Sequence, residues 1–302
     1  MLILHSLPKA ELHLHLEGSI EPETLRELGA PEYKCQYSDF AGFIEAFKWV
    51  TSYLRSPQDY ALVTRHLLAN LELQNVQYAE ITLSAGVVLW RKQDFSAIYD
   101  AVRQASAGSS VDVHWILDAI RHFGSEPAME VAQMAAERVQ DGVVAFGIGG
   151  DEARGSAEWF GDVFSFARSR GLRLTAHAGE TCGPESVSKA LDIGAERIGH
   201  GISSVRDPAL LRRLRDSDVP LEICISSNVA TGAVANLADH PLRRIYDAGV
   251  PIVLNSDDPA MFGCTLTSEY ELARDRFGFS DRELLELAEN SFRYGFRNKR
   301  AL

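Results

Sequence analysis

Eight short apolar runs, separated by segments with a helical pattern, follow one another along this 302-residue chain. Runs of this length and character, bounded by turn residues, are typical of buried strands. Strands that alternate with helices form parallel sheets, and eight such units can close into a barrel. The alternation therefore predicts an α/β fold, a (β/α)8 TIM barrel that forms one domain over residues 1–302. The runs cover residues 10–16, 76–83, 111–118, 143–148, 172–177, 195–200, 219–226 and 251–256, the sixth being the weakest.

Helix-start signals between the runs support this alternation. Ser56-Pro57 and Asp207-Pro208 place a proline at the first helical position, and Gly183-Pro184 opens another helix. The segment 280–283 has a capping-box pattern ahead of a leucine-rich stretch. An open doubly wound sheet is the alternative, but no Gly-x-Gly-x-x-Gly motif follows the first run, which favours the barrel.

The connection between the first two runs is about sixty residues long, which exceeds the usual connection in an α/β fold. It carries five aromatic residues, Tyr37, Phe40, Phe43, Phe47 and Trp49. Most of them are expected to pack a helix pair. The sequence thus predicts a helical insertion after the first strand, and residues 30–55 are a candidate lid over the barrel mouth.

Charge and composition exclude several classes of partner. The formal net charge of −12 argues against a nucleic-acid backbone or an anionic membrane surface. No apolar run of 18 residues and no signal-peptide pattern is present. The four cysteines are scattered without a Cys-x-x-Cys motif, which argues against a zinc knuckle or a disulfide framework and fits a reducing cytoplasm. A cytoplasmic enzyme with a small-molecule substrate is expected; the oligomeric state is not readable from the sequence.

The first run contains two histidines that can share one metal ion. Successive side chains of a strand point to opposite faces, so His13 and His15 project on the same side. Leu12, Leu14 and Leu16 take the other face, and Gly18 is expected to end the strand. Two ordinary histidines on a half-buried strand are the alternative.

The position of further polar residues favours the metal site. In parallel barrels the active site lies at the carboxyl ends of the strands. Unusual polar groups occupy the ends of six of the eight runs: His13, His15 and Glu17; Gly149-Gly150-Asp151-Glu152; His177-Ala178-Gly179-Glu180; His200-Gly201; Ser226-Ser227-Asn228; and Ser256-Asp257-Asp258-Pro259. Scattered core histidines would not be distributed in this way.

Residue types then suggest the chemistry. His13, His15 and His177 supply three nitrogen ligands and Asp257 can supply an oxygen, a set typical of catalytic zinc. Zinc lowers the pKa of its bound water toward ~7 and makes hydroxide available near neutral pH.

Three further residues are candidates for proton transfer or substrate binding. Glu180 follows His177 by three residues and is a candidate proton carrier, while His200 is a candidate for orienting or deprotonating the attacking water. Asp258 is expected to point at a substrate nitrogen. A helix N-cap followed by Pro259 is the alternative explanation of the two aspartates.

Taken together, these motifs resemble the adenosine and adenine deaminases of the amidohydrolase superfamily. The resemblance spans nearly the whole chain in family order: residues 8–18, Gly150-Asp151-Glu152, His177-Ala178-Gly179-Glu180, Gly199-His200-Gly201, Ser227-Asn228 and Asn255-Ser256-Asp257-Asp258-Pro259. It implies one zinc ion per chain, held by His13, His15, His177 and Asp257. Binuclear relatives place a modified lysine at the end of the fourth strand, where this chain has glycine and acidic residues.

The resemblance also implies how a 6-aminopurine is bound. Glu180 is expected to protonate N1, His200 to assist the attacking hydroxide, Asp258 to bond N7 and the Gly150 backbone to face N3. Glu17 stands where adenosine deaminases usually carry Asp, facing the 5′ end of the ribose.

Two departures from the family pattern bear on the substrate. Adenine deaminases usually carry Ser-Glu where this chain has residues 150–152, which favours a nucleoside over a free base. Residues 224–228 and 258–262 are most similar to the bacterial branch that deaminates 6-aminodeoxyfutalosine, a menaquinone precursor with a bulky carboxylated 5′ group.

The expected function is zinc-dependent hydrolytic deamination of a 6-aminopurine nucleoside. Free-adenine deamination and plain adenosine deamination are the alternatives among enzymes. A binding protein that kept the fold and lost the chemistry is disfavoured, because Glu180, His200 and the ligand set are intact.

Overall fold

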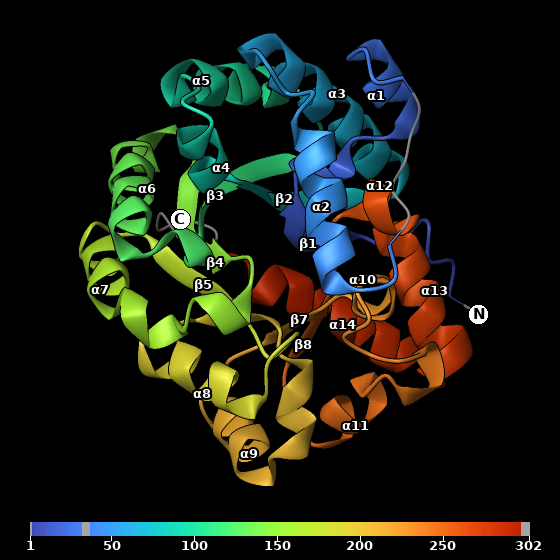
Figure 1. The fold of residues 1–302 in the computed structure, drawn as a ribbon. Coiled ribbons are helices and arrows are strands. Elements are labelled where there is room, and N and C mark those ends of the chain that lie inside the picture. The colour runs from blue at the N-terminus through green and yellow to red at the C-terminus, as the bar shows by residue number, and fades with distance from the viewer. Residues whose placement is uncertain (1, 32–36, 297–302) are drawn as a thin grey trace.

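Eight parallel strands form the centre of the computed structural model, which describes residues 2–31 and 37–296 (Figure 1). The strands lie side by side in chain order. The ring closes where the backbone N–H of His15 donates to the Asp257 carbonyl (2.8 Å) and that of Asp257 to the His13 carbonyl (3.0 Å). The expected parallel barrel is confirmed. Its strands are β1 (Lys9–His15), β2 (Val76–Leu83), β3 (Asp112–Ile120), β4 (Val143–Gly149), β5 (Arg173–Ala178), β6 (Arg197–His200), β7 (Leu221–Ile223) and β8 (Ile252–Leu254).

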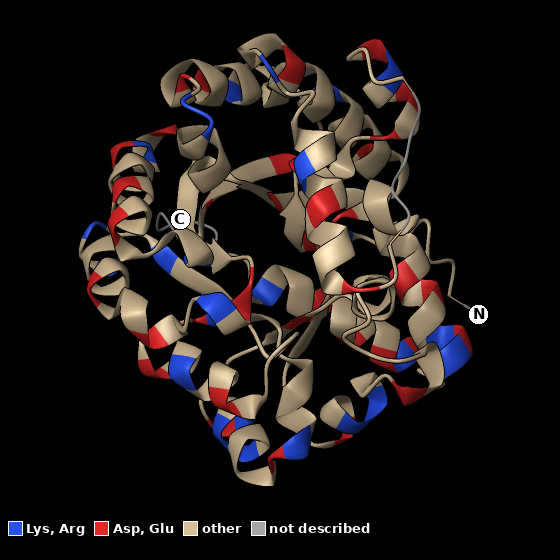
Figure 2. Ribbon diagram, in the orientation of Figure 1, with Lys and Arg blue, Asp and Glu red and all other residues tan. Residues whose placement is uncertain are grey.

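Helices occupy the connections and surround the strands (Figure 1). Charged residues lie mostly along these outer helices (Figure 2). None of the helices in the described ranges combines the length and apolar character needed to cross a membrane. The helices are α1 (Pro22–Glu27), α2 (Phe40–Thr51), α3 (Pro57–Leu73), α4 (Ala85–Trp90), α5 (Phe95–Ser106), α6 (Ser125–Glu137), α7 (Gly161–Ser169), α8 (Pro184–Asp192), α9 (Pro208–Asp216), α10 (Ile225–Ala230), α11 (Leu242–Asp247), α12 (Pro259–Phe262), α13 (Leu266–Phe277) and α14 (Asp281–Arg293).

The predicted helix starts are present. Ser56 and Ser280 each form a capping box at the start of α3 and α14, and the Asp207 carboxylate caps α9. Pro184 opens α8 directly after Gly183.

Three of the strands end earlier than predicted. The seventh run, 219–226, contains only the three-residue strand β7, because α10 begins at Ile225. The carboxylate of Glu269 accepts the backbone N–H groups of Ile225 (2.7 Å) and Ser226 (3.2 Å), and so caps that helix. The eighth run is a strand only over Ile252–Leu254, and β1 ends at His15, before Gly18.

The insertion after β1 differs in detail from the predicted helix pair. Its described residues form α1, α2 and α3, and residues 32–36 of the 30–55 segment lie outside the described ranges. In α2, the ring of Phe43 contacts Tyr37 at a centroid distance of 5.6 Å and Phe262 of α12 at 5.2 Å. These contacts hold α2 beside the loops at the carboxyl end of the barrel. Whether the segment moves as a lid stays a prediction.

Candidate active site

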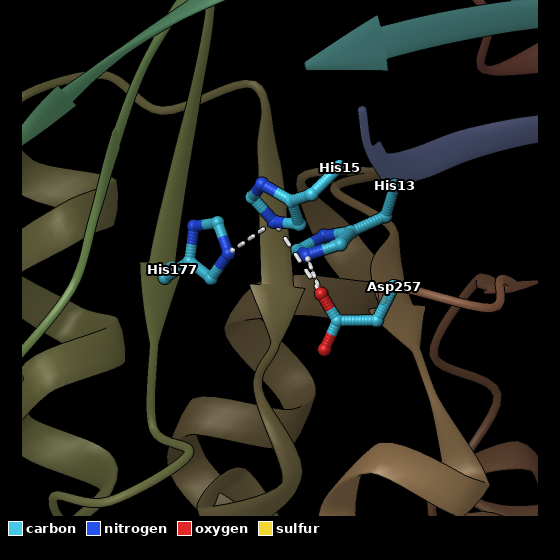
Figure 3. Close-up of side chains that lie close together, drawn as sticks. All are labelled: His13, His15, His177 and Asp257. Carbon is cyan, nitrogen blue, oxygen red and sulfur yellow. Dashed lines mark hydrogen bonds and ion pairs between the residues drawn. The ribbon is translucent and has the colours of Figure 1, made fainter. Parts of the chain in front are cut away.

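The four predicted metal ligands meet at the carboxyl end of the barrel (Figure 3). Asp257 Oδ1 is 3.3 Å from Nε2 of both His13 and His15, and the Nε2 atoms of His15 and His177 are 3.3 Å apart. One ligand atom from each residue lies within 4.8 Å of all the others. Three imidazole nitrogens and one carboxylate oxygen form the donor set that mononuclear zinc sites use.

Outer contacts leave the Nε2 atoms of two ligands free for a metal. The Nδ1 atom of His13 donates to Glu222 Oε2 (2.7 Å), and that of His177 donates to the Ile148 carbonyl (3.2 Å). These bonds place the lone pair of each imidazole on Nε2, facing the other ligands. In the described part of the chain, the buried His13 Nε2 atom forms no hydrogen bond. The residues present therefore fit a divalent cation.

Buried charges hold Glu222 in place beneath His13. The Arg197 guanidinium lies between Glu222 Oε1 (2.5 Å) and Glu80 Oε2 (2.6 Å), and its Cζ is 3.6 Å from the centroid of the Phe296 ring. All three charged side chains are almost completely buried. Because each charge has a partner, this chain of ion pairs fixes the orientation of His13.

Asp257, a predicted metal ligand, also has a structural role. Its φ of 63° lies in the left-handed region, and its backbone N–H and carbonyl supply the two bonds that close the barrel. Ser227 donates its hydroxyl to Asp257 Oδ2 (2.6 Å), which directs the other oxygen toward the histidines.

Glu180 lies beside the metal group on a loop that Glu152 holds. The Glu152 carboxylate accepts the backbone N–H groups of Gly179 (2.7 Å), Glu180 (2.8 Å) and Thr181 (2.9 Å). The side chain of Glu180 accepts from Thr231 Oγ1 at 3.3 Å. Burial raises the pKa of Glu180 to about 8, so the carboxyl keeps its proton near neutral pH in the metal-free chain.

His200 faces both Glu180 and Asp257. Its Nε2 is 3.6 Å from Glu180 Oε2 and 3.9 Å from Asp257 Oδ2. Asn228 Nδ2 donates to its Nδ1 (3.0 Å), and His240 Nε2 donates to Asn228 Oδ1 (3.1 Å). Burial lowers the pKa of His200 to about 4, so the ring is neutral and this network places its proton on Nε2.

Gly150 and Asp258, the predicted purine contacts, both line the cavity. Gly150 has a φ of +87°, and a Cβ there would lie 3.2 Å from His122 Nδ1. The Asp258 Oδ1 atom is buried and has no hydrogen-bond partner in the described chain. A Cβ on Gly18 would lie 1.7 Å from that oxygen, which explains why the first motif needs glycine at this position.

Glu17 is placed differently from the other predicted contacts. Its Oε1 accepts the backbone N–H of Ser84 (3.0 Å), and Ser84, not Glu17, belongs to the cavity wall. Burial raises the pKa of Glu17 to about 7. Its contact with the 5′ end of a ribose stays a prediction.

One cavity of about 620 Å³ joins these groups to the outside. Its deep wall includes His15, His177, Glu180, His200 and Asp257, and its outer wall includes Phe40, Phe43 and Phe47 of α2 together with Trp90 and Phe123. Such a volume is typical of sites for small organic ligands.

Asp118, near the end of β3, also lines the cavity and was missed by the sequence analysis. Its Oδ2 lies 2.8 Å from the position that a Cβ on Gly149 would take, and burial raises its pKa to about 7. The signal was present, because Asp118 ends the third run directly after the apolar residues Trp115, Ile116 and Leu117.

Comparisons with known proteins agree with this site. A model of the adenosine deaminase family matches residues 8–301. Aminodeoxyfutalosine deaminase of Streptomyces coelicolor is 39% identical over 310 residues, covering 96% of this chain and 80% of that protein. Adenine deaminase of Rhizobium leguminosarum is 37% identical over 306 residues, covering 96% and 95%. The crystal structure of adenine deaminase from Arthrobacter aurescens has a TM-score of 0.90 at 29% identity, over 96% of this chain and 94% of that one.

These matches confirm the expected class of enzyme, a hydrolase that acts on the carbon–nitrogen bond of an aminopurine. They match nearly the full length of the chain, including every segment that contributes to the site. The chain belongs to the adenosine deaminase family.

Proposed function

We propose that this chain removes the 6-amino group of a purine nucleoside by zinc-dependent hydrolysis, releasing ammonia and a 6-oxopurine. The proposal rests on one observation: a single cavity joins the metal-binding group and Glu180 to a wide aromatic mouth. The deep end has the groups that deamination needs, and the outer part has room for more than a purine ring.

One zinc ion per chain would be held by His13, His15, His177 and Asp257. When bound, zinc supplies a hydroxide nucleophile near neutral pH by lowering the pKa of a water ligand. A second group of possible ligands, His200, Cys224 and Asp257, shares Asp257 with the first. Burial raises the pKa of Cys224 well above its ordinary value, which keeps the thiol protonated and makes this second group a poor site.

The remaining residues bind the purine and move protons. Glu180, held as the neutral acid, donates a proton to N1 as C6 becomes tetrahedral, so that no negative charge accumulates on the ring. His200 orients the attacking water through its Nε2–H. Asp258 bonds N7 through the oxygen that lacks a partner in the described chain, and the Gly150 backbone faces N3.

The substrate that fits best is 6-aminodeoxyfutalosine. A free base would fill only the deep part of a cavity of about 620 Å³, whereas a nucleoside with a bulky 5′ group extends to the aromatic mouth. The aminodeoxyfutalosine deaminase of Streptomyces coelicolor supports this assignment at 39% identity. Adenine is the second candidate, because the Rhizobium leguminosarum adenine deaminase is 37% identical.

A substrate panel tests the proposal. Conversion of a 6-aminopurine into a 6-oxopurine changes its ultraviolet absorbance, so 6-aminodeoxyfutalosine, adenosine and adenine can be compared directly with zinc-loaded enzyme. We expect the highest kcat/KM for 6-aminodeoxyfutalosine and the lowest for adenine. A higher kcat/KM for adenine than for both nucleosides would contradict the proposal.

A further inference from the structure

The charged residues that line the cavity are segregated by depth. The side chains of the acidic ones are buried, that of Glu180 being 7% exposed, and they lie at the deep end: Asp118, Glu180, Asp257 and Asp258. The basic ones lie at the mouth, on or beside the more exposed segments: Lys48, Arg91 and Arg154. Acidic residues outnumber basic ones by 42 to 30 in the whole chain. A mouth lined only by bases in such a chain favours a ligand whose outer end is anionic.

Two of these three bases already have partners. Lys48 Nζ pairs with Glu45 Oε1 at 2.6 Å on the same helix. The Arg91 guanidinium donates to the backbone carbonyls of Thr51 and Ser52 at the end of α2. The Arg91 side chain therefore joins the end of α4 to the end of α2, whereas Lys48 pairs within α2.

Arg154 is the base that remains available. It ends the short 3-10 helix Glu152–Arg154 after β4, and in the described part of the chain its guanidinium forms no ion pair or hydrogen bond. An unpaired guanidinium at the rim of a cavity can bind a carboxylate or phosphate through two parallel hydrogen bonds.

The proposed purine orientation brings the sugar toward Arg154. With N1 at Glu180 and N3 at the Gly150 backbone, N9 and its ribose leave on the Gly150 side of the cavity. A Cβ on Gly150 would touch His122, and Arg154 follows Gly150 by four residues. In this orientation a long 5′ substituent can reach the segment that carries Arg154.

An apolar surface lies on the same side of the mouth. The rings of Trp90 and Phe123 stack at a centroid distance of 6.1 Å and an interplanar angle of 24°, and the ring of His122 lies 4.9 Å from that of Phe123. Trp90 is 65% exposed although it lines the cavity. Contact with the apolar part of a 5′ substituent would remove this exposed aromatic ring from water, which favours binding.

We propose that Arg154 binds the anionic end of the 5′ substituent while Trp90 and Phe123 cover its apolar part, so that this rim selects which nucleoside is deaminated. The inference rests on the proposed deamination of a nucleoside. Carboxylate and phosphate share the chemistry that a guanidinium recognises, and the apolar surface favours the carboxylate of a bulky organic group.

The test compares zinc-loaded wild type with Arg154→Gln on three nucleosides. They are 6-aminodeoxyfutalosine, which carries a carboxylate, adenosine 5′-monophosphate, which carries a phosphate, and adenosine, which carries no 5′ anion. We expect Arg154→Gln to lower the ratio of kcat/KM for 6-aminodeoxyfutalosine over adenosine by about 10- to 100-fold, the size of a lost charge-assisted hydrogen bond. A selective fall in the ratio for the monophosphate instead would identify phosphate as the ligand and overturn the choice of carboxylate.

A matched control separates local binding from the overall charge of the protein. Arg212 lies on α9, is exposed and does not line the cavity, and Arg212→Gln removes the same charge. We expect its substrate ratios to equal those of wild type. Equal ratios in Arg154→Gln and wild type, or an equal fall in both variants, would overturn the inference although nucleosides are still deaminated. Turnover of adenine alone would instead overturn the proposed function and the inference with it.

Discussion

The protonation state of Glu180 is the residue-scale property on which the proposed chemistry depends. An ordinary glutamate is ionised at neutral pH and cannot donate a proton to N1. Burial, with the nearby Asp257 carboxylate as a lesser cause, raises the pKa of Glu180 to about 8. The loop that carries Glu180 is in turn fixed by Glu152, so the acid is both neutral and well oriented.

This pKa predicts the alkaline side of the pH profile. The protonated fraction of Glu180 falls as the pH rises through the pKa, so kcat/KM should decline in the alkaline direction. A bound divalent cation stabilises the carboxylate form, so in the zinc-loaded enzyme the decline should begin below about pH 8. Steady-state rates across about pH 6 to 9 check this. A kcat/KM that rises steadily over that range would show that Glu180 does not act as the acid.

Single residues differ in how far the sequence can predict their place. His13 and His15 could be predicted because the two-residue period of a strand puts both on one face, whatever surrounds them. The role of Glu152 could not be predicted, because its carboxylate accepts three backbone N–H groups that lie 27 to 29 positions further along the chain. The availability of Arg154 likewise depends on which neighbours the folded chain leaves unpaired.

At the scale of elements, a strand was predicted well where a local pattern marks it and poorly where a distant residue decides its end. β2 coincides with its predicted run, which is buried over its whole length except at Gln77. The end of the seventh run became α10 because Glu269, from α13, caps it. A cap supplied by a distant helix leaves no local pattern in the sequence.

Helix α14 packs against both β1 and β8, the strands that precede or carry three of the predicted metal ligands, His13, His15 and Asp257. Its start is fixed by the capping box, in which Glu283 N–H donates to Ser280 Oγ (3.4 Å) and Ser280 N–H donates to the Glu283 carboxylate (2.8 Å). Ser280→Ala should lower the free energy of unfolding by about 0.5–2 kcal/mol and leave kcat unchanged.

Urea unfolding followed by circular dichroism measures that loss. Ser165→Ala is the control, because Ser165 is exposed in the middle of α7, where alanine favours the helix. Equal stabilities of the two variants would show that the cap contributes nothing to α14.

At the scale of the whole molecule, the barrel brings together predicted metal ligands that are up to 244 positions apart, since His13 and Asp257 meet at 3.3 Å. We expect about one zinc ion per chain in protein purified without a chelator. The variant His15→Ala should lose both the metal and the activity. Elemental analysis with protein quantification measures the number of zinc ions per chain. Two tightly bound metal ions per chain, one of them lost in Cys224→Ala, would show that the second ligand group is occupied as well.

The central claim is that Glu180 supplies the proton and the metal group does not depend on it. Glu180→Gln keeps the size of the side chain but cannot cycle a proton. The most direct measurement is ammonia release from 6-aminodeoxyfutalosine by zinc-loaded wild type and zinc-loaded Glu180→Gln. The variant should keep its zinc and its affinity for substrate, while kcat falls by ~10²–10⁴, the usual contribution of general acid–base catalysis. A kcat close to that of wild type in the zinc-loaded variant would contradict the account.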